Sequence, residues 1–182
     1  DIDGESAGDN SGRSVSLSSD GTIVAIGADK NDGNGNKSGH VRVYGWNGSN
    51  WIQRGRDIDG EAAEDYSGNT VSLSSDGTIV AIGAYGNDGK GANTGHVRVY
   101  EWDGSTWIQK GADIDGEARG DNSGNSVSLS SDGNTLAIGA LLNDVPPANS
   151  DGLNIGHVRV YGWNGSTWIQ KGADIDGEAA GD

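Results

Sequence analysis

Four acidic stretches of nearly the same nine residues recur along the chain: DIDGESAGD, DIDGEAAED, DIDGEARGD and DIDGEAAGD. All four stretches have acids at relative positions one, three, five and nine. Carboxylates on alternate residues of a curled segment can point their oxygens inward, and Ca²⁺ prefers six to eight such ligands. The second and third stretches therefore hold candidate Ca²⁺ ligands: Asp57, Asp59, Glu61 and Asp65, and Asp113, Asp115, Glu117 and Asp121.

A second interpretation makes these stretches linkers between structural units, and we call them the acidic linkers. Gly60 is the fourth residue of its stretch, whereas an EF-hand loop has its invariant glycine at the sixth position. In a linker, Asp side chains accept hydrogen bonds from backbone amides, and Gly adopts positive φ. Carboxylates held together without a cation would repel one another, so both interpretations stay open.

Pairs of tryptophans flank short Asn-Gly or Asp-Gly segments, which are strong hairpin signals. A four-residue loop places the two members of a pair opposite each other on adjacent strands, where they stabilise the sheet. The same rings could instead bind the apolar faces of sugars. The six candidate carbohydrate-binding residues are Trp46, Trp51, Trp102, Trp107, Trp163 and Trp168.

Histidines and asparagines recur at fixed places as well. A histidine precedes each Val-Arg-Val segment, and we expect strand positions rather than ligands, because nothing in the local sequence brings two together. Asn-x-Ser sequons on predicted loops are candidate glycosylation sites if the chain passes through a secretory pathway that glycosylates. The histidines are His40, His96 and His157, and the sequon asparagines are Asn36, Asn47 and Asn164.

The composition excludes several classes of protein. The formal net charge is −15, which argues against binding to nucleic acid or to anionic membrane surfaces. Cysteine is absent, so the chain has neither disulfides nor thiolate metal sites. Hydrophobic residues make up 32% of the chain, without Phe or Met, which favours small apolar clusters between stacked sheets over one large core.

The acidic linkers divide the chain into tandem repeats. They begin at Asp1, Asp57, Asp113 and Asp174, giving spacings of 56, 56 and 61 residues. The repeats are 1–56, 57–112 and 113–173, and 174–182 starts a fourth. The third repeat is longer because VPPANSDGLNIG stands where the second has GKGANTG, and we expect this insertion on an outward loop.

Each repeat contains four strand patterns separated by turn signals. In the second repeat they are TVSLS, TIVAIGA, HVRVYEW and TWIQK. Four antiparallel strands in about 56 residues, repeated without helices, predict an all-β fold of β-propeller blades, each a four-stranded antiparallel sheet. A β-solenoid is the alternative, although its coils are usually shorter and need no hairpin turns.

SGNTVSLSSDGTIVAIGA, followed after a loop by GHVRVYEW, resembles the FG-GAP repeat of integrin α-subunit propellers, and most closely its bacterial and algal variant. The chain departs from the family in two ways. Ser67 stands where the family name has Phe, and the family's Asp-x-Asp-x-Asp-Gly calcium loop is reduced to SSDG. WD-repeat propellers are a second resemblance, but their repeats are shorter, at roughly 40–45 residues.

Propellers close with four to eight blades, so three blades do not make a ring. The repeated linker therefore indicates a segment of a longer array, or copies of the chain that join head to tail into a filament. Each candidate catalytic residue recurs in every repeat, so we do not expect an enzyme.

Together with the resemblance, this pattern predicts a non-catalytic protein of the extracellular space or cell surface, with a structural or adhesive role. A carbohydrate-binding propeller is the alternative. The expected partners are further repeats or copies of the same chain, together with glycans or cell-surface proteins. Nucleic acid binding and membrane insertion are not expected. Ca²⁺ is the one expected cofactor.

Overall fold

The computed structural model describes residues 1–144 and 154–179, which form β-strands joined by turns and loops. The first sheet contains β1 (Ser14–Leu17), β2 (Ile23–Ala28), β3 (His40–Trp46), β4 (Trp51–Gln53) and β5 (Ile58–Asp59). The second sheet contains β6 (Thr70–Leu73), β7 (Ile79–Ala84), β8 (His96–Trp102), β9 (Trp107–Gln109) and β10 (Ile114–Asp115). The third sheet contains β11 (Ser123–Leu129), β12 (Thr135–Ala140), β13 (His157–Trp163), β14 (Trp168–Gln170) and β15 (Ile175–Asp176). Within the two described ranges, no helix is long and apolar enough to cross a membrane.

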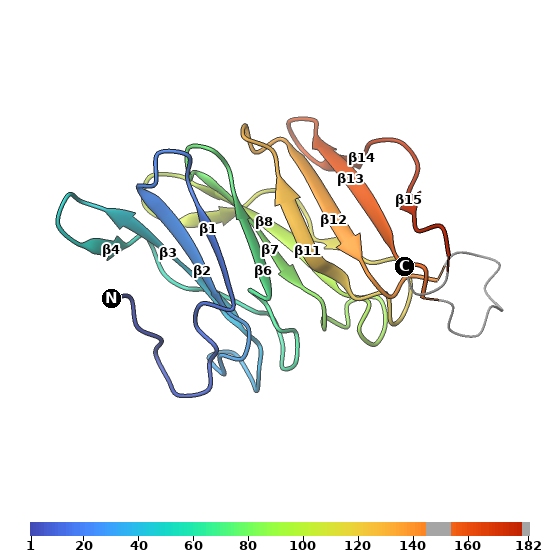
Figure 1. The fold of residues 1–182 in the computed structure, drawn as a ribbon, viewed down its shortest axis with the longest axis horizontal. Coiled ribbons are helices and arrows are strands. Elements are labelled where there is room, and N and C mark those ends of the chain that lie inside the picture. Colours follow the sequence, from blue (N-terminus) through green and yellow to red (C-terminus); the bar gives the residue numbers. More distant parts are fainter. Residues whose placement is uncertain (145–153, 180–182) are drawn as a thin grey trace.

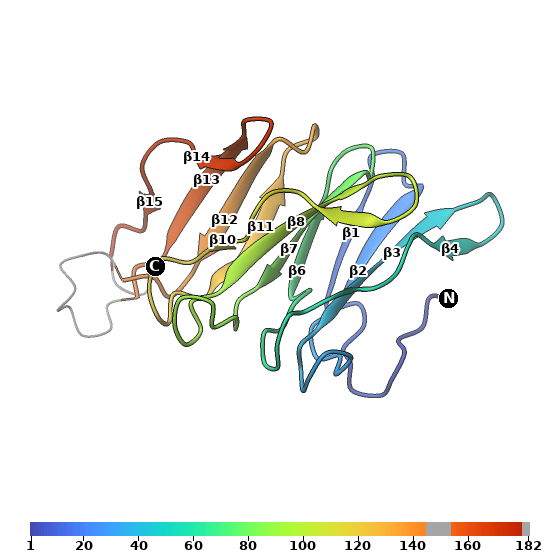
Figure 2. The same cartoon turned by 180° about the vertical axis from the view of Figure 1, so that it is seen from behind.

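Each of these three sheets is antiparallel, and we call it a blade. In the first blade the order is β1-β2-β3-β4, and the other two blades have the same arrangement. The three sheets stand side by side in sequence order (Figures 1 and 2). The expected all-β fold of four antiparallel strands per repeat is therefore confirmed.

A short fifth strand, which the sequence did not predict, extends each blade. β4 pairs only with Tyr44, Gly45 and Trp46 of β3. The other half of that edge is taken by β5, where His40 pairs with Asp59 and Val41 with Ile58. The acidic linker is therefore partly a strand of the blade that precedes it.

Apolar side chains from two blades form each core. On β7, Val80 and Ile82 pack into the cluster shared with the first blade, whereas Ile79 and Ala81 face the third. This strand is buried along its whole length, as its continuous apolar sequence predicts. The blades are thus held together by a hydrophobic layer at each junction.

Glycine in the Ile-Gly-Ala segment allows neighbouring blades to approach at the backbone level. A Cβ added to Gly83 would collide with the carbonyl oxygen of Gly124 in the next blade. Gly27 meets Gly68 in the same way at the first junction. Only glycine fits such an approach without displacing the backbone.

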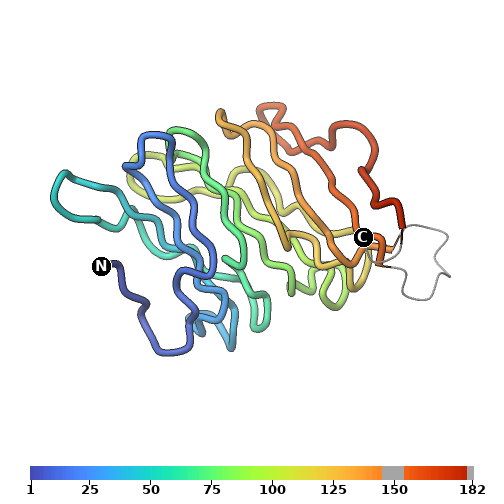
Figure 3. The backbone as a smooth tube through the Cα atoms, viewed as in Figure 1, coloured from blue at the N-terminus to red at the C-terminus, as the bar shows by residue number. Residues whose placement is uncertain are grey.

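The two long edges of the molecule differ (Figure 3). The tight turns between first and second strands lie along one edge, and the acidic linkers lie along the other with the loops that join second to third strands. In the first of these turns, Asp20 accepts hydrogen bonds from the Ser18 hydroxyl at 2.7 Å and the Thr22 amide at 3.0 Å. These bonds lower the Asp20 pKa to about 2, with Ser18 as the largest cause. Most of the expected loop insertion, residues 145–153, lies outside the described residues.

The two end faces expose residues that are buried at the internal junctions. Val15 and Leu17 of β1 are 64% and 59% exposed, whereas their equivalents Val71 and Leu73 are each 7% exposed. At the opposite end, Ile175 is 61% exposed. Its equivalents Ile58 and Ile114 are buried at 5% and 6%. The first and last blades therefore present complementary halves of an interblade core.

Candidate functional site

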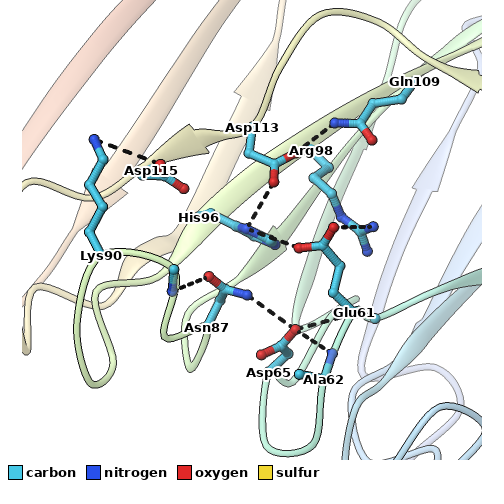
Figure 4. Close-up of polar contacts among 12 residues, drawn as sticks. Glu61, Ala62, Asp65, Asn87, Lys90, His96, Arg98, Gln109, Asp113 and Asp115 are labelled. Atoms are coloured by element: carbon cyan, nitrogen blue, oxygen red, sulfur yellow. Dashed lines mark hydrogen bonds and ion pairs between the residues drawn. The ribbon is translucent and has the colours of Figure 1, made fainter.

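The acidic linkers bring carboxylates to the start of the third strand of each blade. In the second blade, Glu61 comes from the linker that enters the blade, and Asp113 comes from the linker that leaves it. Between them lies His96, the first residue of β8. Its Nδ1 atom is 3.9 Å from Glu61 Oε2 and 3.9 Å from Asp113 Oδ2 (Figure 4).

The same Glu-His-Asp triad recurs in every blade. His40 Nδ1 is 3.8 Å from Glu5 Oε2 and 3.7 Å from Asp57 Oδ2. In the third blade, the corresponding distances from His157 Nδ1 are 3.9 Å to Glu117 and 3.7 Å to Asp174. In each triad, the three candidate ligand atoms lie within 4.8 Å of one another, an arrangement that could hold a metal ion.

Neighbouring polar groups fix the orientation of both carboxylates. Gln109 Nε2 donates a hydrogen bond of 2.6 Å to Asp113 Oδ1, which leaves Oδ2 facing the imidazole. Arg98 Nη1 lies 3.6 Å from Glu61 Oε1, and its Nη2 donates to the Asp59 carbonyl at 2.6 Å. Gln53 and Gln170 make the same 2.6 Å bond in the other blades. The arrangement thus belongs to the repeat.

The histidines are almost completely enclosed, while the glutamates are not. The His96 side chain is 2% exposed and that of Glu61 is 45% exposed. Burial lowers the pKa of His96, and the positive charge of Arg98 lowers it further against the opposing effects of Asp113 and Glu61. His96 is therefore neutral at physiological pH, which is the protonation state that binds metals.

The four candidate ligands of the second linker do not converge on a single loop. Asp57 joins the triad of the preceding blade, and Glu61 joins that of the following blade. Asp65 is buried and caps a turn, accepting hydrogen bonds from the backbone amides of Glu61 and Ala62 at 3.2 and 3.0 Å. Asp59 lies on β5 and is exposed.

The third linker divides its acids in the same way. Asp113 and Glu117 belong to two different triads, and Asp121 caps a turn through the amides of Glu117 and Ala118. Asp115 lies on β10 and forms an ion pair of 3.7 Å with Lys90. The spacing of acids within one linker therefore does not describe how they cluster.

The sequence placed the histidines on strands, which is confirmed, but their contact with two carboxylates was missed. Each histidine stands 17 residues before the aspartate of its triad. In the first two blades it also stands 35 residues after the glutamate. These constant spacings were the signal in the sequence for a shared cluster. The contact between the histidine and the two carboxylates is visible only in the folded blade.

The tryptophan pairs face each other across the hairpins as predicted, with ring centroids 5.3 to 5.4 Å apart. In the second blade they also bind the preceding blade. Trp107 Nε1 donates to the Arg54 carbonyl at 2.8 Å, and the Arg54 guanidinium lies 4.8 Å from the Trp102 ring centroid. Lys110, Trp163 and Trp168 repeat these contacts in the third blade.

The first pair has no such cover, and Trp46 is 43% exposed. Its partner Trp51 is partly buried and packs against the small cluster of the first blade. A tryptophan pair that faces a neighbouring blade is thus a packing element, whereas in the pair at the end of the row the ring of Trp46 is exposed to solvent.

The sequon asparagines are all exposed. Asn47 and Asn164 each close a hairpin loop, with the side-chain oxygen accepting backbone amides at 2.9 Å. Asn36 differs, because Ser38 of its sequon is fully buried and its hydroxyl contacts Asn31 and Asn34. The hairpin sequons are the more accessible ones in the folded chain.

Comparison with known proteins gives a family match. Residues 3–44 and 58–100 match the model described as the FG-GAP repeat. No curated protein matches the chain. A putative 6-phosphogluconolactonase from Bacteroides uniformis is similar over 91% of this chain and 55% of its own, with 14% identity and a TM-score of 0.49. The tricorn protease is similar over 92% of this chain and 17% of its own, with 10% identity and a TM-score of 0.48.

This chain thus spans about half the length of the first structure and less than a fifth of the second. The order of elements in each blade and the two repeat matches agree with each other. They identify residues 3–44 and 58–100 as FG-GAP repeats.

Proposed function

We propose that this chain is a non-catalytic structural or adhesive protein of the cell exterior, and that its blades form part of a longer array. The observation that carries the proposal is the difference in burial between equivalent residues. Leu73 is enclosed by the first blade, whereas Leu17, its equivalent, is exposed on the end face. An exposed apolar face of this kind marks an interaction site.

The occupant we propose for each end face is another blade of the same sequence type. At the first junction, Val71 and Leu73 pack against Val41, Val43 and Ile58. The last blade presents the equivalents of these three residues, with Val158 and Ile175 exposed. Because the two faces are halves of one repeated contact, the association is head to tail, and it forms a filament if it does not close into a ring.

A catalytic role is not part of the proposal. Enzymes generally need one asymmetric arrangement of acid, base and nucleophile. Here the triads are equivalent in every blade, as are the glutamine and arginine contacts that orient them. Recurrence of this kind is typical of a site with a structural role in each repeat.

Calcium is not favoured by the geometry of the linkers. Ca²⁺ takes oxygen ligands, and the acids expected to surround it are divided among triads, turn caps and strands. Each triad instead contains an imidazole nitrogen. We therefore assign no calcium loop to the acidic linkers.

Carbohydrate binding is the second candidate, and the exposed Trp46 favours it. The equivalent rings of Trp102 and Trp163 are covered by Arg54 and Lys110 of the preceding blade. A glycan that binds the chain, and that Trp46→Ala abolishes without loss of fold, would support this role. If no glycan binds the parent chain, the tryptophans serve packing.

Electron microscopy of the protein as isolated from its source tests the leading proposal. Long regular fibres are expected if blades continue from copy to copy, and discrete discs if they continue within one closed propeller. Isolated three-blade particles with both end faces bare would contradict the proposal.

A further inference from the structure

Each triad lies where two acidic linkers meet the third strand of one blade. We propose that every triad binds one divalent transition metal ion of the zinc class, held by the imidazole Nδ1 and one oxygen from each carboxylate. The ligand sets are Glu5, His40 and Asp57, then Glu61, His96 and Asp113, then Glu117, His157 and Asp174. This proposal does not depend on what covers the end faces.

The distances in the triads fit such an ion after a small movement. Zn²⁺ binds imidazole nitrogen and carboxylate oxygen at about 2.0 to 2.2 Å, so tetrahedral coordination separates two ligands by about 3.4 Å. The Nδ1 atom of His96 is 3.9 Å from each carboxylate oxygen. Small shifts of both carboxylates, the half-exposed Glu61 and the partly exposed Asp113, would close this difference.

The buried imidazole is the observation that points to a ligand. His96 is 2% exposed, and its Nδ1 is aimed between two carboxylates at a distance too long for a hydrogen bond (Figure 4). Neither carboxylate is therefore a hydrogen-bond partner of Nδ1, although buried polar groups are normally satisfied. An ion bound between Nδ1 and the two carboxylates would supply that partner.

The contacts around the carboxylates are those expected around a metal site. Ligating carboxylates are usually held by further hydrogen bonds that set their orientation. Gln109 holds one oxygen of Asp113, and Arg98 lies beside one oxygen of Glu61. In both carboxylates it is the other oxygen that faces His96.

The ligand types decide the class of ion. Imidazole suits zinc, copper, iron and nickel, whereas calcium and magnesium prefer oxygen ligands. In the first blade, His40, Glu5 and Asp57 line an open cavity of about 520 Å³. Water can therefore complete the coordination of an ion that takes only three ligands from the protein.

The experiment is calorimetric titration of ZnCl₂ into the full chain after dialysis against a chelator. We expect saturation at three ions per chain, and at two per chain for Glu61→Gln. Glu61 is half exposed, so this variant keeps its fold, which circular dichroism checks. A combined Glu5→Gln, Glu61→Gln and Glu117→Gln variant should bind none.

Asp59→Asn is the matched control. It removes one charge from the same linker at an exposed position outside the triad, so three ions should still bind. An equal loss of binding in Asp59→Asn and Glu61→Gln would overturn the proposal, because it would reduce the effect to general attraction by negative charge. Equal occupancy by CaCl₂ in competition would also overturn it.

A second measurement reports the imidazole directly. Zinc should shift the ¹⁵N resonance of Nδ1 in all three histidines, and Glu61→Gln should cancel the shift of His96 alone. Zinc uptake that leaves the histidine resonances unchanged would place the ions elsewhere.

Discussion

A leucine that occurs at the same place in consecutive repeats offers a direct test of the blade junction. Leu73 is 7% exposed and packs between two blades, whereas Leu17 is 59% exposed on the end face. The sequences around them are nearly identical, SVSLSSDGTIVAIGA and TVSLSSDGTIVAIGA. Differences in strand propensity therefore cancel, and the Leu→Ala substitution measures burial alone.

The difference in burial between Leu73 and Leu17 sets the expected difference in lost stability. A buried Leu→Ala change costs about 2–5 kcal/mol through lost transfer energy and the cavity left behind. Leu73→Ala should reduce the free energy of unfolding by about 3 kcal/mol. Leu17→Ala should change it by less than about 1 kcal/mol, because more than half of that side chain is already in water.

Urea unfolding, followed by tryptophan fluorescence and by far-ultraviolet circular dichroism, gives the comparison. With an m value of about 2 kcal/mol/M, Leu73→Ala should lower the midpoint by more than 1 M at an unchanged m value. Leu17→Ala should leave the midpoint nearly unchanged.

Adding a repeat before the first blade makes Leu17→Ala a second test of the blade junction. A copy of residues 57–112 placed before Asp1 would continue the natural linker spacing and cover β1 with another blade. In that longer chain, Leu17→Ala should become as costly as Leu73→Ala. If Leu17→Ala remained without effect there, the end face would not be a blade junction, and the continuation of the array would be refuted.

Further predictions concern packing, titration and assembly. Gly83→Ala should lower the free energy of unfolding in urea by about 1–3 kcal/mol, because the new methyl group meets the Gly124 carbonyl. Gly162→Ala is the control and should be tolerated, since Glu101 occupies the same position in the second repeat. Equal losses of stability in the two variants would contradict this prediction. By NMR, Asp20 should titrate near pH 2 rather than at its ordinary value of 3.8. Because its pKa is lowered on folding, its contribution to stability is present above about pH 4 and is lost as the pH falls toward 2. A midpoint near 3.8 would mean that the turn does not hold in solution. In sedimentation, Leu17→Lys and Val158→Lys should each block one end face, and their mixture should form one-to-one dimers; association of either variant alone would exclude the head-to-tail contact.

Most of each blade could be predicted because its signals are local. Alternating residues such as Val71 and Leu73 mark a half-covered strand, and WDGSTW fixes the register that places Trp102 opposite Trp107. These patterns depend only on residues that are close together in the sequence. Their recurrence in every repeat then indicates blades.

The candidate site could not be predicted in the same way. Glu61 and Asp113 belong to different linkers, and they meet only because β8 begins between them. The strand β5 has two residues and exists because β4 leaves part of β3 unpaired. The acidic pattern likewise did not indicate that the buried carboxylate of Asp65 caps a turn.

The division of each acidic linker between two triads separates the sequence repeat from the structural unit. A segment excised as residues 57–112 would contain His96 and Glu61 but would lack Asp113, which completes their cluster. It would also lose β10, which pairs with the edge of β8. A self-contained module must therefore run from one linker through the next, so that consecutive modules overlap in sequence. Engineered arrays of this repeat can be extended by adding whole repeats, because each added copy supplies the aspartate that completes the preceding cluster, but the last unit must be followed by one more linker.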